Sequence, residues 1–194
     1  MLKQKHFIFL GLLICASTSA MADSSYNKFK NSTCPDVVTE KADALFGAGS
    51  GDITSCISVR EDLKIVVALN NKDINSRNGK GQQVLNVKNI VADYTENYAM
   101  ESGKDFKVVV VGYGAGARWL LSDDAYMLNF GVENPSDDIV ATLLSTGVKV
   151  FMCQNTMKGN GWVSSDLIPG VEMVPAGVTA VIDFQNRDFT YIAP

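Results

Sequence analysis

Histidine is almost absent from this chain of 194 residues: the only one is His6, near the amino terminus. Because His6 falls in a segment that we expect to be removed, any chemistry of the mature protein must proceed without imidazole. This excludes Ser-His-Asp and Cys-His arrangements, in which a histidine activates the nucleophile. Cysteine and histidine do not cluster at zinc-binding spacing either. We therefore expect no metal and no other cofactor, and sulfur chemistry is what remains.

Residues 1–22 have the pattern of a secretory signal peptide. Lys3 and Lys5 form a basic start, residues 7–15 an apolar stretch, and Ala20-Met21-Ala22 a cleavage site ahead of Asp23. The apolar stretch is too short to span a bilayer, and no later segment approaches the necessary length. We expect cleavage after Ala22 and a periplasmic protein without a membrane span.

Acidic residues outnumber basic ones by 21 to 17, which gives a net charge of −4. Removal of Lys3 and Lys5 with the signal leaves 15 basic and 21 acidic residues, a net charge of −6, on 172 residues. An acidic chain argues against nucleic acid or an anionic membrane surface as the partner. A lipoprotein attached through Cys15 is disfavoured, because Ile14 stands where a small residue is wanted.

Three cysteines remain after residue 22, namely Cys34, Cys56 and Cys153. An odd number in an oxidising compartment implies one disulfide and one leftover thiol, or a thiol that pairs between molecules. Cys34 and Cys56 flank a stretch rich in glycine and serine, so we expect a local disulfide worth about 3 kcal/mol of loop-closure entropy. Cys153 is then the free thiol.

Strands and helices alternate along most of the chain. A polar extension, residues 23–62, contains a short helix predicted over residues 35–45. Apolar patterning then predicts strands at residues 63–69, 107–111, 148–152, 171–174 and 190–192, and helices at residues 82–100, 134–147, 164–167 and 178–184. Asn134 is the predicted cap of the second of these helices. The alternation indicates one α/β domain, residues 63–194, with a mostly parallel five-stranded sheet.

Cys153 is predicted at the carboxyl end of a central strand, where reactive groups gather in open parallel sheets. Gln154, Asn155 and Thr156 follow in a predicted polar turn, which would place the thiol at the rim of the core. Backbone N–H groups of that turn and the nearby Lys158 would favour a thiolate. The alternative is a buried structural cysteine, which is common in proteins.

A glycine-rich run, Gly112-Tyr113-Gly114-Ala115-Gly116-Ala117, follows the second strand and matches the dinucleotide fingerprint G-x-G-x-x-A. Glu133 lies about twenty residues further on, where a ribose-binding acid is expected. The context does not fit, because residues 118–121 provide only a stub of helix before Ser122-Asp123-Asp124. We expect Gly112 and Gly114 to shape a pocket near Cys153 instead.

The polar loop of residues 70–81 lacks the spacing of a phosphate-binding loop. It contributes Asp73 and Arg77, which are candidates to face the same pocket. A solvated loop is the alternative for both side chains.

The segment Gly147-Val148-Lys149-Val150-Phe151-Met152-Cys153-Gln154-Asn155-Thr156-Met157 resembles the cysteine segment of DsrE/DsrF-like proteins. The resemblance continues through residues 166–171, Val174-Pro175-Ala176-Gly177-Val178 and residues 191–194, and upstream through residues 85–89. It implies a three-layer α/β/α sandwich and a homo-oligomer, often a trimer or hexamer. In members that relay sulfur, it also implies a cysteine that carries sulfane sulfur as a persulfide, which here corresponds to Cys153.

These features predict a periplasmic sulfur carrier or sulfurtransferase that exchanges sulfur at Cys153 with a donor or acceptor protein. The alternative is a binding module without catalysis on the same fold. In that case the loops of residues 70–81 and 112–116 would form, with Cys153, a pocket for a small ligand.

Overall fold

The computed structural model describes residues 34–56 and 62–194. These residues belong to two compact units, Met1–Ser58 and Val59–Pro194, which we describe separately. The predicted signal peptide lies outside the described residues. No helix within the described ranges is long and apolar enough to cross a membrane.

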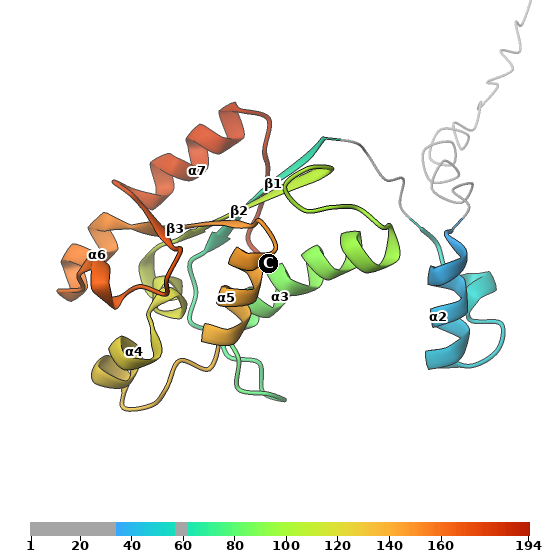
Figure 1. Cartoon of the computed structure of the whole chain (residues 1–194), viewed down its shortest axis with the longest axis horizontal. Helices are drawn as coiled ribbons and strands as arrows, with labels where there is room; N and C mark the ends of the chain where they lie inside the picture. Colours follow the sequence, from blue (N-terminus) through green and yellow to red (C-terminus); the bar gives the residue numbers. More distant parts are fainter. Residues whose placement is uncertain (1–33, 57–61) are drawn as a thin grey trace, which may run out of the picture. The chain divides into compact units, whose positions relative to one another are not determined.

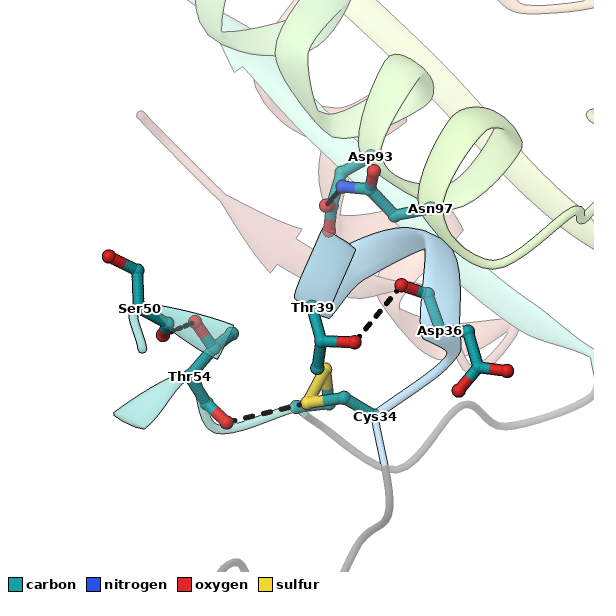
Figure 2. The surroundings of a disulfide bond; sticks show 8 residues. Cys34, Asp36, Thr39, Ser50, Thr54, Asp93 and Asn97 are labelled. Carbon is teal, nitrogen blue, oxygen red and sulfur yellow. Dashed lines mark hydrogen bonds between the residues drawn. A yellow bond between two sulfur atoms is a disulfide. The ribbon is translucent and has the colours of Figure 1, made fainter. Parts of the chain in front are cut away.

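The first unit is a short helix closed by a disulfide (Figure 2). It consists of helix α2 (Asp36–Phe46), where a helix was predicted, and the 3-10 turn η1 (Gly51–Ile53). A disulfide joins Cys34 to Cys56 across 22 residues of sequence. The N–H of Gly51 donates to Asp43 Oδ1 at 2.8 Å, which ties the turn to the helix. The Cys34–Cys56 disulfide therefore closes a small unit in which little apolar surface is buried.

Reduction of the Cys34–Cys56 bond is expected to open this unit, because so short a segment cannot build a sufficient core of its own. The loop-closure contribution of about 3 kcal/mol corresponds to an increase of about a hundredfold in the open population. Limited proteolysis with and without reductant, followed by peptide mapping, measures cleavage within residues 34–56. Equal cleavage rates under the two conditions would contradict the expectation.

The second unit is built on a five-stranded sheet of order β4-β3-β2-β1-β5. All neighbouring strands are parallel, so the prediction of a mostly parallel sheet is confirmed. The strands are β1 (Leu63–Leu69), β2 (Phe106–Gly112), β3 (Lys149–Cys153), β4 (Glu172–Val174) and β5 (Thr190–Ile192). The neighbouring strands β1 and β2, which lie inside the sheet, are largely buried, as their valine-rich sequences require.

Helices cover both faces of the sheet, with α3 and α5 on one face and α7 on the other (Figure 1). The helical elements are α3 (Gln82–Ala92), the π-helical turn η2 (Asp93–Asn97), η3 (Gly114–Leu120), α4 (Asp123–Phe130), α5 (Asp137–Ser145), α6 (Gln154–Asn160), η4 (Ser164–Asp166) and α7 (Gly177–Asn186). The larger core cluster lies on the α3 and α5 face and includes the fully buried Phe106, Trp119 and Leu120. A smaller cluster beneath α7 contains Val66, Val111 and Val181. The three-layer α/β/α sandwich is confirmed.

The short helical stub predicted over residues 118–121 corresponds to the end of the 3-10 helix η3. The sequence analysis missed α4, which follows it: the hydroxyl of Ser122 accepts from the N–H of Ala125 at 3.4 Å and caps this helix. The predicted start of α5 is wrong. Asn134 does not cap α5, which begins at Asp137. Its side-chain oxygen accepts from the N–H of Ser136 at 3.0 Å, in the turn ahead of the helix, and its amide nitrogen donates to the carbonyl of Leu121 at 2.7 Å. Asn134 therefore ties the turn before α5 to the end of η3.

Candidate functional site

Cys153 is the last residue of β3 and directly precedes α6, so the predicted polar turn is wrong. Side chains alternate between faces along a strand, which places Cys153 on the same face as Phe151, under α7. The thiol belongs to the carboxyl end of the sheet, as predicted, but only 4% of the residue is exposed. It is also the one free cysteine among the described residues.

Hydrogen-bond donors from two helix starts surround the sulfur of Cys153. The N–H of Gly177, the first residue of α7, donates to Sγ at 3.2 Å. The hydroxyl and N–H of Thr156 and the N–H of Asn155, all in the first turn of α6, lie near the sulfur and lower the pKa of the thiol. Backbone N–H groups at a helix start have no partner within their own helix. They are therefore available to stabilise negative charge on the sulfur.

Two opposing influences set the pKa of the Cys153 thiol. Burial is the largest single influence, and it raises the pKa. The hydrogen bonds from Thr156, Gly177 and Asn155 lower the pKa. Their combined effect exceeds that of burial, so the pKa of the thiol lies below its ordinary value. The folded protein therefore loses this proton before the unfolded chain does. The resulting stabilisation is present above the ordinary cysteine pKa and is lost as the pH falls through the folded-state pKa.

Thr156 connects the thiol to the glycine-rich loop that follows β2. The N–H of Gly114 donates to Thr156 Oγ1 at 3.0 Å. Gly114 adopts a φ of +56°, a left-handed conformation that glycine accepts readily. A hydroxyl can accept and donate at the same time, so Gly114 fixes the oxygen of Thr156 while the proton remains available for Cys153. Gly114 is thus linked to the surroundings of Cys153 through Thr156, and its role in shaping a pocket stays a prediction.

Gly177 is a glycine because the ring of Tyr113 lies against it. A Cβ at position 177 would come within 2.7 Å of Tyr113 Cβ. Tyr113 Oη in turn accepts from Asn70 Nδ2 at 3.3 Å and forms a hydrogen bond with Tyr191. Burial first, and then the neighbouring Tyr113, raise the pKa of Tyr191. These contacts link Gly177 through Tyr113 to Asn70 and Tyr191, and the sequence analysis did not identify them.

The other predicted site residues are less closely involved. Gln154 and Asp73 are exposed, and Lys158 is exposed in the last turn of α6. The groups that lower the pKa of Cys153 do not include Lys158. Gly112 is buried, and a Cβ there would lie 2.5 Å from a methyl group of Leu120. Its role is close packing at the end of β2.

The glycine-rich run after β2 serves backbone packing rather than the geometry of a dinucleotide site. A Cβ on Gly116 would lie 2.6 Å from the backbone of Leu69 and Asn70. The run continues into the 3-10 helix η3 instead of the long helix that a dinucleotide fingerprint opens. Within residues 34–56 and 62–194, no group of three or more histidine, cysteine or carboxylate side chains is placed to hold a metal ion.

Replacement of Thr156 by valine is expected to raise the pKa of Cys153, because the hydroxyl donor is lost while the shape of the side chain is retained. The rate of alkylation by iodoacetamide, measured against pH, should shift to higher pH and fall several-fold at neutral pH. Thr156→Ser keeps the hydroxyl and should retain the original profile. Identical pH profiles for Thr156→Val and the unmodified chain would show that the hydroxyl does not stabilise the thiolate.

Comparison with known proteins agrees with this architecture. The family model described as the DsrE/DsrF-like family matches residues 64–194. Among solved structures, the protein of unknown function MTH1491 from Methanobacterium thermoautotrophicum is similar, with a TM-score of 0.52 and 28% identity. The match covers 69% of this chain and 100% of that one. Comparison with curated proteins gave no match.

Proposed function

This chain belongs to the DsrE/DsrF-like family, and from that premise we propose that it is a sulfur carrier or sulfurtransferase that holds sulfane sulfur as a persulfide on Cys153. The family has a fold of the sulfur-relay type. The observation that carries the proposal is the ring of donors around Cys153 Sγ, including the N–H of Gly177 at 3.2 Å. These donors stabilise a thiolate, which is the nucleophilic form of cysteine.

The proposed transfer uses only thiol and persulfide chemistry. The Cys153 thiolate attacks the outer sulfur of a donor persulfide, a new S–S bond forms on Cys153, and the S–S bond of the donor breaks. The donor leaves as a thiolate, so one sulfur atom is exchanged and the electrons balance between the two partners. Delivery repeats the step in the other direction, with the thiolate of an acceptor attacking the outer sulfur on Cys153. Neither half needs a metal or an imidazole.

Intact-mass spectrometry after incubation with cysteine persulfide tests the proposal. The chain is expected to gain the mass of one sulfur atom, and cyanide should then remove that atom as thiocyanate. Peptide mapping should place the added sulfur on the peptide that contains Cys153. A chain that gains no sulfur, or gains it elsewhere, would contradict the proposal.

We further propose that the protein works in the periplasm and exchanges sulfur with a donor or acceptor protein. The support is the signal-like pattern of residues 1–22 together with the disulfide between Cys34 and Cys56, a bond typical of exported proteins. Cell fractionation of a tagged full-length chain, with amino-terminal sequencing of the product, tests the location and the cleavage after Ala22.

A homo-oligomer, trimer or hexamer, is the expected assembly. Apolar surface is exposed on and beside α7 at three side chains, Val178, Ile182 and Tyr191. The hydrophobic cluster that α7 covers is the smaller of the two in the core. Light scattering should give a mass at least three times that of one chain, and Ile182→Asp should lower it. Leu128→Asp on α4, also an exposed apolar position, is the matched control and should leave the mass unchanged. A monomeric mass for the unmodified chain would exclude the expected assembly.

One observation favours the alternative of a binding module without catalysis, namely the burial of all but 4% of Cys153. A buried structural thiol reacts slowly and resists oxidation. Alkylation by iodoacetamide at neutral pH separates the alternatives: a rate above that of a free cysteine peptide favours a sulfur carrier, and a much lower rate favours the binding module.

A further inference from the structure

Three lysines lie together on the α7 face of the sheet, at the end opposite Cys153. They are Lys64 on β1, Lys107 on β2 and Lys149 on β3, and we call them the lysine stripe. Their face follows from the alternation of side chains, because Val66, Val109 and Phe151, two residues further along each strand, pack under α7. Sequence analysis did not single them out, since each is an isolated lysine in its own strand.

The arrangement of the lysine stripe is electrostatically unfavourable. Lys64 and Lys107 are direct partners in adjacent strands, where backbones run about 4.8 Å apart. Like charges in such positions repel and destabilise a sheet. Within the part of the chain that the structure describes, neither lysine forms an ion pair. Two facing lysines with no acidic ion-pair partner among residues 34–56 and 62–194 are a local conflict, which is expected at interaction sites.

A groove accompanies the charges. It has a volume of about 280 Å³ and is lined by Lys107, Lys149 and Phe189 together with Gly103 and Gly147. Gly147 lies two residues before β3 and lines the groove beside Lys149 and Lys107. The ammonium group of Lys64 lies 6.0 Å from the centre of the Phe189 ring. Positive charge therefore borders a recess with an aromatic wall.

Among the described residues, Lys149 is the one member of the stripe with an acidic partner. Its ammonium group lies 3.4 Å from Glu172, and both side chains are mostly exposed. Exposed pairs of this kind contribute little to stability. A competing carboxylate from a partner can therefore replace Glu172 at small cost.

We propose that the lysine stripe and the Phe189 groove form a docking surface for an acidic protein segment that carries an apolar side chain. Carboxylates would neutralise the repelling lysines, and the apolar side chain would enter the groove beside the ring. Nucleic acid and anionic bilayers fit less well, because the chain as a whole carries a net charge of −4 and repels extended polyanions. Docking here does not depend on sulfur transfer, although Lys149 and Cys153 project from the same face of β3.

Fluorescence anisotropy of a short labelled peptide of repeated Glu-Glu-Phe units, titrated with the full chain, tests the docking surface. The triple variant Lys64→Gln, Lys107→Gln, Lys149→Gln is expected to bind about tenfold more weakly or worse. A control triple variant, Lys72→Gln, Arg77→Gln, Lys88→Gln, removes the same charge from exposed positions elsewhere and should change affinity by less than about twofold. Binding of the unmodified chain should weaken with salt.

Four outcomes would overturn the proposal. The control variant could lose as much affinity as the stripe variant, or a peptide with glutamine in place of glutamate could bind equally well. Vesicles containing anionic phospholipid could bind while the peptide does not, which would indicate a membrane surface. Light scattering could show that the stripe variant loses mass, which would identify the surface as an interface between copies.

A stability measurement tests the repulsion independently. Lys107→Gln should raise the thermal midpoint by about 1–2 °C at low salt and have no effect at high salt. Arg77→Gln is the control and should leave the midpoint unchanged. A lower midpoint for Lys107→Gln would show that the facing lysines do not repel, and would remove the main argument for an anionic partner.

Discussion

Replacement of Cys153 by serine is expected to abolish sulfur uptake while the fold is retained. No other free thiol is present among the described residues, so uptake from cysteine persulfide should fall at least about a hundredfold. The serine oxygen can still accept the hydrogen bond from Gly177. The cost in the free energy of unfolding should therefore be only about 1–2 kcal/mol, for the smaller and more polar side chain. Intact mass and the thermal midpoint measure the two effects.

The matched variant Cys153→Ala separates a thiolate site from a structural cysteine. Alanine accepts no hydrogen bond, so the N–H of Gly177 and the hydroxyl of Thr156 would lose a partner, at about 1–3 kcal/mol for a buried unsatisfied group. We therefore expect the alanine variant to be less stable than the serine variant. A purely apolar structural cysteine would give the opposite order. That reversed order, or sulfur uptake that persists in Cys153→Ser, would exclude Cys153 as the sulfur carrier.

Replacement of Gly177 by alanine is expected to have the second largest effect. The new Cβ would lie 2.7 Å from Tyr113 Cβ, a separation that forces the start of α7 away from the ring. Overpacking of this kind costs about 1–3 kcal/mol. The shift also moves the Gly177 N–H away from Cys153 Sγ, which raises the pKa of the thiol because one donor to the thiolate is lost. Sulfur uptake at neutral pH should fall several-fold.

Gly159→Ala provides the matched control. Gly159 lies in α6, and a Cβ there would meet no atom within 4 Å. Alanine is favoured over glycine inside a helix by about 0.5–1 kcal/mol, so this variant should be slightly more stable and keep full sulfur uptake. If Gly177→Ala behaves like Gly159→Ala in chemical denaturation and in uptake, the close packing of α7 on Tyr113 has no part in the site.

Local patterns in the sequence predicted the elements whose causes are local. The valine-rich runs of β1 and β2 predicted buried parallel strands, because strands covered on both faces require apolar side chains at successive positions. The apolar spacing from residue 82 predicted α3. Two helices escaped detection. Helix α4 is short, and its cap Ser122 and first residues Asp123 and Asp124 also resemble a loop. Helix α6 begins with the polar run Gln154-Asn155-Thr156. Short polar helices depend on tertiary contacts more than on propensity.

The sequence by itself determined that Cys153 lies at the carboxyl end of a buried strand. In the parallel sheet of an α/β protein, reactive groups gather at the carboxyl ends of the strands. Only the tertiary structure decided what surrounds the sulfur. Gly177 is 24 residues from Cys153, and Gly114 is 42 residues from Thr156. These groups meet because β2 and β3 are neighbours in the sheet and α7 packs across them. A hydrogen bond between distant segments depends on strand order and helix packing, which leave no periodic pattern in the local sequence.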